Sequence, residues 1–354
     1  MYGSNYGYRS GLNSSMVRHL QNKVLRLEKF VGLTPKDLVL DIGSNDATSL
    51  KSYSVPCKKI GIDPTSEKFK KYYTEDIVRV PEFFSAEVFR KHCGDLKAKI
   101  VTSIAMFYDL ESPLTFAKDV ESILADDGIW HFEQSYMPTM LKNLSYDTIC
   151  HEHLEFYSLQ VVKNILEEAG LKILNVELND INGGSFAVTA CKKEAIYEVN
   201  HESIDALLNE EKVLGLSTDK PYLNFAKRAQ IHREKIKTLL DDLAKKNLKV
   251  LGYGASTKGN VLLQYCDITT EQISCIVEVN EDKFGSFTPG TNIPIISEDE
   301  GRKLKPDYYF VLPWHFKENI LKRERKFLEN GGKFIFPLPE IEILGIEAID
   351  LQEG

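Results

Sequence analysis

The sequence predicts an α/β protein with two Rossmann-like domains, each a mostly parallel sheet with helices on both faces, the second domain being the smaller. Short apolar segments typical of strands alternate with amphipathic segments typical of helices, which favours parallel sheets wound on both faces. Glycine-bearing strand-turn-helix segments occur twice, at 38–50 and at 249–263. The length of 354 residues exceeds one ordinary domain and suits two.

The first half of the first domain shows one helix followed by regularly spaced strands. Residues 13–30 have an amphipathic helical pattern that Asn13 or Ser14 can open and Gly32 can close. The apolar segments expected to form parallel strands are 38–40, 59–62, 100–104 and 128–132. Helical patterns separate these strands, as a doubly wound sheet requires.

The second half of this domain has a different pattern. We expect a helix at 159–169 and a strand at 172–176. Asn182-Gly183-Gly184 then breaks the chain before an apolar strand at 185–189, which predicts a hairpin-like pair.

Residues 195–246 are charged and helical in pattern, with no glycine-rich break beyond Gly215, and predict long helices between two α/β units. The strands expected in the second unit are 249–254, 273–278, 308–312 and 333–336. We therefore expect a first domain at 1–195, a helical linker at 196–246 and a second domain at 247–354.

Composition and charge limit the classes of protein. With 43% hydrophobic and 27% charged residues, the chain has the composition of a soluble globular enzyme. The net charge of −8 argues against a nucleic-acid partner, which needs a broad basic surface. No apolar run approaches the roughly 20 residues that span a bilayer, and the N-terminus lacks the pattern of a signal peptide. The six scattered cysteines favour neither structural zinc nor disulfides, so a reducing cytoplasm is expected.

The first glycine-bearing turn, Asp41-Ile42-Gly43-Ser44-Asn45-Asp46, has the features of a nucleoside site. Gly43 supplies a residue without Cβ where the backbone must approach a ligand. Open α/β sheets bind ligands at the carboxyl ends of their strands. The next strand ends at Asp63-Pro64, where a carboxylate can accept both ribose hydroxyls.

A single glycine followed by an acid separates this turn from a dinucleotide site. A dinucleotide fingerprint needs three glycines around a pyrophosphate, and Asp46 would repel a diphosphate. S-adenosylmethionine carries no phosphate and has an ammonium group that an acidic turn attracts. We therefore predict S-adenosylmethionine as the cofactor; the alternative is an ordinary strand-helix turn with a capping aspartate.

The densest group of reactive side chains lies at 146–157, where His151 and His153 flank Glu152. The zinc-protease pattern would require histidine in place of Glu155, and a metal bound by the two histidines lacks an obvious third ligand nearby. A histidine tuned by a carboxylate can instead remove a proton beside a carbonyl at physiological pH. We favour this acid-base role over the alternative of hydrogen-bonded structural histidines.

The second glycine-bearing turn, residues 251–260, follows a strand and opens a helix. Its backbone N–H groups, together with Ser256, Thr257 and Lys258, form a potential anion site. The spacing G-x-G-x-x-x-x-G departs from both the dinucleotide fingerprint and the P-loop. Glu278 ends the next strand, where a ribose-binding acid is expected. A nucleotide suits this pattern, and NAD is the weaker interpretation.

These motifs, in the same order and over nearly the whole length, resemble those of the S-adenosylmethionine-dependent C-methyltransferases of deoxysugar biosynthesis, which act on nucleotide-linked sugars. The segments that carry the resemblance are Tyr6-Gly7-Tyr8-Arg9-Ser10-Gly11, Leu40-Asp41-Ile42-Gly43-Ser44-Asn45-Asp46, residues 147–157 around His151-Glu152-His153, Asn182-Gly183-Gly184-Ser185-Phe186 and Gly254-Ala255-Ser256-Thr257-Lys258-Gly259-Asn260.

The resemblance implies an N-terminal zinc module, a central methyltransferase domain and a C-terminal Rossmann-like domain that helps to hold the nucleotide-sugar. The chain begins where the zinc module would end, so we expect that module to be missing. The resemblance also implies that His153 removes the proton beside a keto group, and that the enolate then attacks the activated methyl. Glu152 would orient this base, and Tyr8 would lie near the sugar.

Two positions depart from the deoxysugar enzymes, and both would face the substrate. Those enzymes usually carry a histidine in the segment that here includes Met106 and Tyr108, and often a tyrosine where this chain has Cys150. The alternatives are a methyltransferase of the same build acting on a hydroxyl or another carbon acid, an NAD-dependent nucleotide-sugar dehydrogenase or isomerase, and a non-catalytic nucleotide-sugar-binding scaffold.

Three sets of site residues follow from the motifs and the resemblance. The set expected at the proton transfer is His153, Glu152, His151, Tyr8 and Tyr108. The set expected to hold the cofactor is Asp41, Gly43, Asn45, Asp63, Pro64 and Met106. The set expected to bind a small-molecule substrate is Tyr6, Arg9, Cys150, Ser185, Gly254, Ser256, Thr257, Lys258, Asn260 and Glu278. We expect neither a metal nor a membrane partner.

Overall fold

The computed structural model describes residues 8–350, and the chain divides into two compact units made of separate segments. Unit 1 comprises the described residues up to Met137, then Leu154–Asp180 and Gly184–Val213. Unit 2 comprises Pro138–His153, Ile181–Gly183 and the chain from Leu214 onward. Each unit contains one α/β sheet, so the predicted fold class is confirmed.

Unit 1 is built on a seven-stranded sheet with the order β3-β2-β1-β4-β5-β7-β6. Its strands are β1 (Leu38–Ile42), β2 (Lys58–Ile62), β3 (Ile77–Val80), β4 (Ala98–Ile104), β5 (Leu124–Ser135), β6 (Leu171–Asn179) and β7 (Ser185–Lys192). β7 runs antiparallel to both β5 and β6, which makes β6 and β7 the hairpin-like pair expected from the sequence. The other neighbouring strands are parallel.

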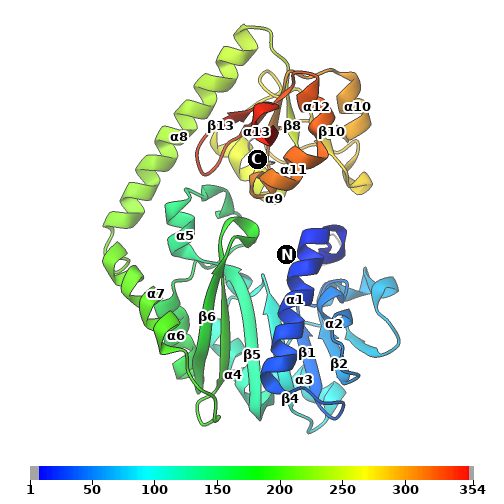
Figure 1. The fold of residues 1–354 in the computed structure, drawn as a ribbon, viewed down its shortest axis with the longest axis vertical. Helices are drawn as coiled ribbons and strands as arrows, with labels where there is room; N and C mark the ends of the chain where they lie inside the picture. Colours follow the sequence, from blue (N-terminus) through cyan, green and yellow to red (C-terminus); the bar gives the residue numbers. More distant parts are fainter. Residues whose placement is uncertain (1–7, 351–354) are drawn as a thin grey trace. The chain divides into compact units, whose positions relative to one another are not determined.

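Helices cover both faces of this sheet (Figure 1). They are α1 (Ser14–Val31), α2 (Thr48–Lys51), α3 (Ala86–Cys93), α4 (Pro113–Ile123), α6 (Leu159–Glu168) and α7 (His201–Leu214). Leu40 of β1 belongs to the apolar core with α3, α4 and α6, whereas its neighbour Val39 belongs to the core with α1 and α2. Successive residues of a strand point to opposite faces of the sheet. A sheet with helices on both faces therefore needs strands that are apolar at successive positions.

Helix α1 has the ends that the sequence predicts. The side chain of Asn13 accepts a hydrogen bond from the backbone N of Ser15, and Gly32 ends the helix with a φ of 61°. The buried face of α1 also carries a charge: Nζ of Lys23 lies 2.9 Å from Oε2 of Glu133 on β5. Since both side chains are buried, this ion pair fixes α1 against the sheet.

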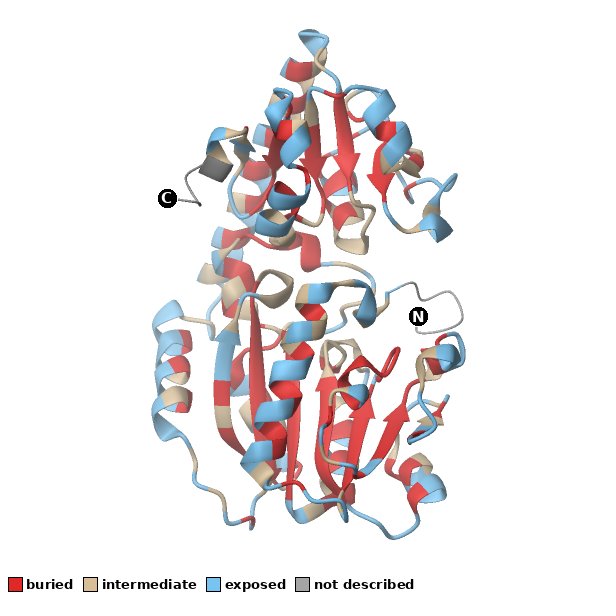
Figure 2. Ribbon diagram, turned by 45° about the vertical axis from the view of Figure 1, so that its right-hand side comes forward, coloured by how far each residue is buried: buried red, intermediate tan, exposed pale blue. Residues whose placement is uncertain are grey.

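Unit 2 is built on a six-stranded sheet with the order β10-β9-β8-β11-β12-β13. Its strands are β8 (Val250–Tyr253), β9 (Ile276–Glu278), β10 (Ile295–Ser297), β11 (Tyr308–Val311), β12 (Lys333–Phe336) and β13 (Glu342–Leu344). Only the β12–β13 pair is antiparallel among the strand pairs of this sheet in the described chain. In both sheets the inner strands are buried along most of their length (Figure 2).

The helices of unit 2 include one long element and several short ones. They are α8 (Lys220–Lys245), α9 (Thr257–Tyr265), α10 (Glu298–Lys303), α11 (Lys317–Arg323), α12 (Arg325–Glu329) and α13 (Glu347–Asp350), and α5 spans Met137–Lys142. The long helices expected between 195 and 246 are thus α7 and α8, with Gly215 at a φ of 73° between them. Within the described chain no helix has both the length and the apolar character needed to cross a membrane.

The strand order reverses once in each sheet. In unit 1, β1 lies between β2 and β4, and in unit 2, β8 lies between β9 and β11. Open α/β sheets bind ligands at such a reversal, outside the carboxyl ends of the strands. The two glycine-bearing turns of the sequence follow β1 and β8, so each stands at the ligand-binding position of its own sheet.

Candidate functional site

The turn after β1 presents an open backbone. Gly43 has a φ of 74° and is exposed, although the residues on both sides of it are buried. A Cβ at this position would lie 3.4 Å from Cγ of Met106, which follows β4. Gly43 and Met106 therefore face each other at the strand-order reversal of unit 1, and the missing side chain lets a ligand approach the backbone.

Asp63 is held firmly at the end of β2. Its Oδ1 accepts hydrogen bonds from the backbone N and the hydroxyl of Thr65, at 2.6 and 2.7 Å, just after Pro64. Its Oδ2 accepts one from the backbone N of Asn45 at 2.7 Å. A carboxylate offers about four acceptor positions, so Asp63 is oriented by the turn and can still accept a hydroxyl.

Asp41 is a buried carboxyl group in the same sheet. Burial, with a smaller contribution from the charge of Asp63, raises its pKa to about 7, although a 2.5 Å hydrogen bond from the hydroxyl of Thr102 opposes the shift. A cation bound nearby would favour the ionised form. The ammonium and sulfonium of S-adenosylmethionine provide such charge, and its ribose provides hydroxyls for Asp63, so the residues present suit this cofactor.

The segment 8–11 lies against this turn. The Asn45 side chain accepts from the backbone N of Ser10 at 3.1 Å and donates to the carbonyl of Tyr8 at 3.0 Å. Oδ2 of Asp46 accepts from the backbone N of Gly11 at 3.1 Å. The amide of Asn45, expected at the cofactor, is therefore used here to hold the N-terminal segment.

Arg9 also helps to hold the segment 8–11, through contacts with Tyr72 and Asp46. Its guanidinium carbon lies 4.5 Å from the centre of the Tyr72 ring, and its Nε lies 3.7 Å from Oδ2 of Asp46. The hydroxyl of Tyr73 donates to the carbonyl of Asn45 at 3.0 Å. The sequence reading did not single out these two tyrosines, which are far from the turn in sequence. Tyr6 lies outside the described residues.

Two other expected residues of unit 1 lie at β4 and β7, the strands on either side of β5. Tyr108 follows β4, and its carbonyl accepts hydrogen bonds from the backbone N atoms of Leu154 and Glu155 at 3.1 and 3.0 Å. Ser185 is the buried first residue of β7 and pairs with Ser135 of β5.

In unit 2, His153 is fixed in one tautomer. Its Nδ1 lies 2.8 Å from the carbonyl oxygen of Thr148, and a carbonyl only accepts, so Nδ1 carries the proton and Nε2 is the basic nitrogen. Burial lowers the pKa of His153 to about 4, and the positive charge of Lys258 contributes. The imidazole is therefore neutral at physiological pH. The neighbours Cys150 and Glu152 are partly exposed, and His151 is exposed.

A buried cluster supports this histidine. Nε1 of Trp314 donates to Oδ2 of Asp147 at 2.8 Å. A Cβ on Gly183 would lie 3.1 Å from the Trp314 ring, so this glycine permits close packing. Nζ of Lys258 donates to the carbonyl of Asn182 at 2.9 Å. Trp314 and Lys258 thus both contact the Asn182-Gly183 motif.

The turn after β8 uses several of its own polar groups. Ser256 caps α9 by accepting from the backbone N of Gly259 at 3.0 Å. Oε2 of Glu278 accepts from the backbone N of Ala255 at 2.8 Å. Thr257 and Asn260 are partly exposed in the first turn of α9.

Trp314 and His315 are site candidates that sequence reasoning missed. Nδ1 of His315 is buried and has no hydrogen-bond partner within residues 8–350. Burial lowers the pKa of His315 to about 3, with a further contribution from Lys258. Both residues follow the strand expected at 308–312, so the rule that ligands bind at carboxyl ends of strands could have found them.

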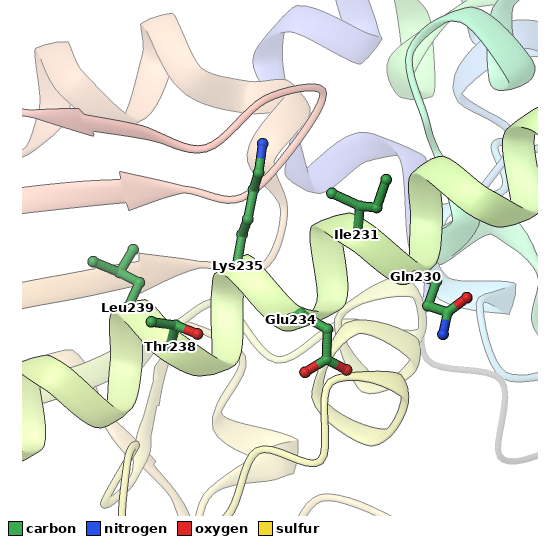
Figure 3. Close-up of a pocket in the computed structure, with 6 residues that line it drawn as sticks. All are labelled: Gln230, Ile231, Glu234, Lys235, Thr238 and Leu239. Atoms are coloured by element: carbon green, nitrogen blue, oxygen red, sulfur yellow. The ribbon is translucent and has the colours of Figure 1, made fainter.

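A hollow along α8 lies apart from these motifs in the chain (Figure 3). All of its lining residues come from this one helix, namely Gln230, Ile231, Glu234, Lys235, Thr238 and Leu239. None of the expected site residues is among them. Over residues 8–350, no three His, Cys, Asp or Glu side chains are grouped so that they could hold a metal ion.

Comparisons with known proteins identify two family models that together match most of the chain. A family model described as a methyltransferase domain matches residues 13–176, and one described as a C-methyltransferase C-terminal domain matches residues 180–339. The C-methyltransferase NovU of Streptomyces niveus is 31% identical over 345 residues, which cover 97% of this chain and 82% of that protein.

Solved structures were also compared. The plantazolicin methyltransferase BpumL, in complex with a triazolic desmethylPZN analog and SAH, is 11% identical with a TM-score of 0.41, over 52% of this chain and 88% of its own. The 1,6-didemethyltoxoflavin-N1-methyltransferase of Burkholderia thailandensis is 13% identical with a TM-score of 0.37, over 49% of this chain and 78% of its own.

The two α/β units and the sequence matches define an S-adenosylmethionine-dependent methyltransferase. Because NovU shares 31% identity over nearly the whole chain, this protein belongs to the C-methyltransferase family.

Proposed function

We propose that this enzyme methylates a carbon beside the keto group of a nucleotide-linked sugar, and that His153 is the base. The observation that carries the proposal is the orientation of His153, whose Nδ1–H donates a hydrogen bond to the carbonyl of Thr148. That bond leaves Nε2 as the nitrogen that can accept a proton. A hydroxyl acceptor and a carbon acid both need such a base, and family membership favours carbon.

Four residues of unit 1 are proposed to hold the cofactor. The backbone at Gly43 and the side chain of Met106 would border it, Asp63 would accept its ribose hydroxyls, and the charge of Asp41 would favour its cationic groups. When bound, S-adenosylmethionine supplies an electrophilic methyl group on a sulfonium. Asn45 would contribute through its backbone and through the segment 8–11 that it anchors.

The acceptor is proposed to bind unit 2. The turn from Gly254 to Asn260 and the carboxylate of Glu278 stand at the strand-order reversal, where a nucleotide suits an open α/β sheet. His153 lies in the same unit and would remove the proton beside the keto group. Its lowered pKa keeps it unprotonated at neutral pH. The carbonyl of Thr148 orients it, in place of the Glu152 side chain expected from the sequence.

The test is product analysis with nucleoside-diphosphate-linked keto-sugars and S-adenosylmethionine. Mass spectrometry should show the gain of one methyl, and NMR should place it on carbon beside the carbonyl. His153→Ala should remove turnover yet keep binding of S-adenosylhomocysteine, whereas His92→Ala, on α3, should leave both unchanged. A methyl found on oxygen, or full turnover by His153→Ala, would contradict the proposal.

A ligand-binding measurement separates this function from an NAD-dependent one. A ligand that binds only the folded state raises its thermal midpoint. S-adenosylhomocysteine should therefore raise the midpoint and NAD should not. The reverse pattern would favour the dehydrogenase or isomerase interpretation.

A further inference from the structure

We propose that Lys258 is a catalytic residue of the acceptor site, whose ammonium binds the acceptor's carbonyl oxygen and stabilises the negative charge that forms there when His153 removes the proton. This inference rests on the proposed function. It also departs from the expectation that Lys258 contributes to a phosphate site at the second glycine-bearing turn.

The first support is where Lys258 points. It lies in the first turn of α9, directly after β8, yet its Nζ donates to the carbonyl of Asn182 at 2.9 Å. Helix α9 packs against the short helix Tyr146–Thr148, and the carbonyl of Thr148 orients His153. Lys258 and the basic histidine are thus fixed on adjoining elements of unit 2.

The second support is that residues 8–350 leave the ammonium with further N–H donors. An ammonium has three N–H groups, and the neutral carbonyl of Asn182 takes one of them. The carboxylate of Asp147 is the opposing charge that acts most strongly on this ammonium; its Oδ2 accepts from Trp314, and its Oδ1 is buried without a hydrogen-bond partner within residues 8–350. Burial lowers the pKa of Lys258, while Asp147 and Cys150 oppose that shift. A desolvated cation with free donor capacity favours an anionic ligand.

The third support is the kind of group that surrounds the ammonium. Burial and the positive charge of Lys258 lower the pKa values of both His153 and His315, so each imidazole is neutral at physiological pH. The backbone N–H groups of Ala255 and Gly259, which a phosphate would use, donate instead to Glu278 and Ser256. One cation beside neutral bases suits a single developing oxyanion better than a doubly charged diphosphate.

The chemistry gives a reason for this arrangement. A base whose pKa is about 4 accepts a proton from carbon only if the carbanion is strongly stabilised. A cation placed at the oxygen supplies that stabilisation in the transition state, where the charge develops. The same charge helps to keep His153 unprotonated. One lysine would therefore keep the base ready to accept a proton and make the C–H group beside the carbonyl more acidic.

The step balances without an oxidant or reductant. The C–H bond beside the carbonyl breaks, and its proton passes to Nε2 of His153. The C–H electron pair forms the C=C bond of the enolate, and the carbonyl π pair moves onto oxygen. The oxygen, now negative, is paired with the ammonium of Lys258.

Proton exchange measures this step without methyl transfer. A nucleoside-diphosphate-linked 4-keto-6-deoxyhexose, with S-adenosylhomocysteine present, is followed by NMR in deuterated water for loss of the proton beside the carbonyl. Lys258→Gln should slow this exchange at saturating sugar by about a hundredfold, the typical effect of losing an oxyanion donor. Its affinity for the sugar nucleotide, measured by calorimetry, should change less than about tenfold.

Matched variants define the comparison. Lys258→Met tests the same loss with an apolar side chain of similar length, should Lys258→Gln fail to fold, and Lys258→Arg should recover part of the rate. Lys249→Gln is the control, because Lys249 precedes β8 at its opposite end and its Nζ binds the carbonyl of Leu304. It should exchange like the wild type.

The possible failures are distinguishable. If Lys258→Gln exchanges the proton at the wild-type rate, the role proposed for Lys258 is wrong, and the proposed function is unaffected. Lost affinity for the nucleoside diphosphate itself, with unchanged exchange at saturation, would make Lys258 a phosphate ligand. If the acid limb of the pH profile of exchange shifts in Lys258→Gln while the plateau rate is unchanged, Lys258 acts only as a positioning residue for His153. No exchange by the wild type would contradict the proposed function and this inference together.

Discussion

Nε1 of Trp314 donates a 2.8 Å hydrogen bond to the buried carboxylate of Asp147, joining two residues 167 positions apart in the chain. Asp147 lies in the short helix whose last residue, Thr148, orients His153. Burial raises the pKa of Asp147, and both Lys258 and the Trp314 bond oppose that rise. The bond therefore favours the ionised form of a carboxyl group in the segment that orients the proposed base.

Replacing Trp314 with phenylalanine should destabilise the folded chain in a pH-dependent way. A hydrogen bond to a buried charge contributes about 2 kcal/mol, and its loss leaves Asp147 less well solvated. The pKa of Asp147 is already raised in the folded state, and the variant would raise it further. Stability lost to Trp314→Phe should therefore be small at acid pH, where Asp147 is protonated, and grow as pH rises through the raised pKa. Urea unfolding at several pH values measures it.

Trp130→Phe is the control for this variant. Nε1 of Trp130 is also a buried donor, but its acceptor is the neutral hydroxyl of Ser103 at 2.9 Å. Its cost should include lost packing and a neutral bond, with no comparable dependence on pH. Equal pH dependence in the two variants would argue against the charge of Asp147 as the cause.

Gly254→Ala should distort the turn after β8. Gly254 has a φ of 79°, and a Cβ there would lie 2.8 Å from Cγ and Cδ of Pro313. Gly285 has a similar φ of 74° with nothing within 4 Å of its added Cβ. Both substitutions carry the backbone cost of about 1 kcal/mol, and only Gly254→Ala adds the overpacking cost of about 1–3 kcal/mol. Matching losses of unfolding free energy would show that Pro313 moves away freely.

Much of the fold could be predicted because its signals are local. Asn13 and Gly32 mark the ends of α1 through capping chemistry that involves only their neighbours. The strands after which Gly43 and Gly254 stand are apolar on both faces, a pattern visible in the sequence alone. The motifs at these turns also indicated a methyltransferase, which family membership confirms.

The remainder depends on contacts between distant positions. No local pattern shows that residues 138–153 pack with elements beyond residue 214, or that Asp147 meets Trp314. Periodicity likewise could not show that Lys258 is directed to the carbonyl of Asn182, because a long side chain can reach many partners from one helix turn. Tyr72 was missed for the same reason, since its partner Arg9 lies 63 residues earlier.

Asp41→Asn should stabilise the enzyme at neutral and alkaline pH. The pKa of Asp41 is about 7 in the folded state, above the ordinary value of 3.8. The folded state therefore holds this proton more tightly than the unfolded one, so the contribution of Asp41 to stability is most favourable at low pH and falls as pH rises from about 4 through about 7. Asparagine cannot ionise, and it should remove a cost on the order of a few kcal/mol above pH 7.

Thermal midpoints between pH 4 and pH 9 would check this, with Asp95→Asn on the exposed turn after α3 as the control. The Asp41 variant should also bind S-adenosylhomocysteine more weakly, because a charge proposed to favour its ammonium is gone. A wild-type pH slope retained by Asp41→Asn would assign the slope to another group.

Asp46→Ala should release the segment 8–11 from the first glycine-bearing turn. Asp46 accepts the backbone N–H of Gly11 and lies near the guanidinium of Arg9, so both contacts are lost together. Deuterium uptake at residues 10–12 should rise by about tenfold or more, equivalent to at least about 1.4 kcal/mol of lost protection. Asp37→Ala is the matched control, since that carboxylate accepts the backbone N–H of Thr34 at the other end of β1. Because the family resemblance implies that Tyr8 lies near the sugar, the KM for the sugar should rise in Asp46→Ala alone. Unchanged uptake at residues 10–12 would mean that Asn45 and Tyr72 hold the segment without Asp46.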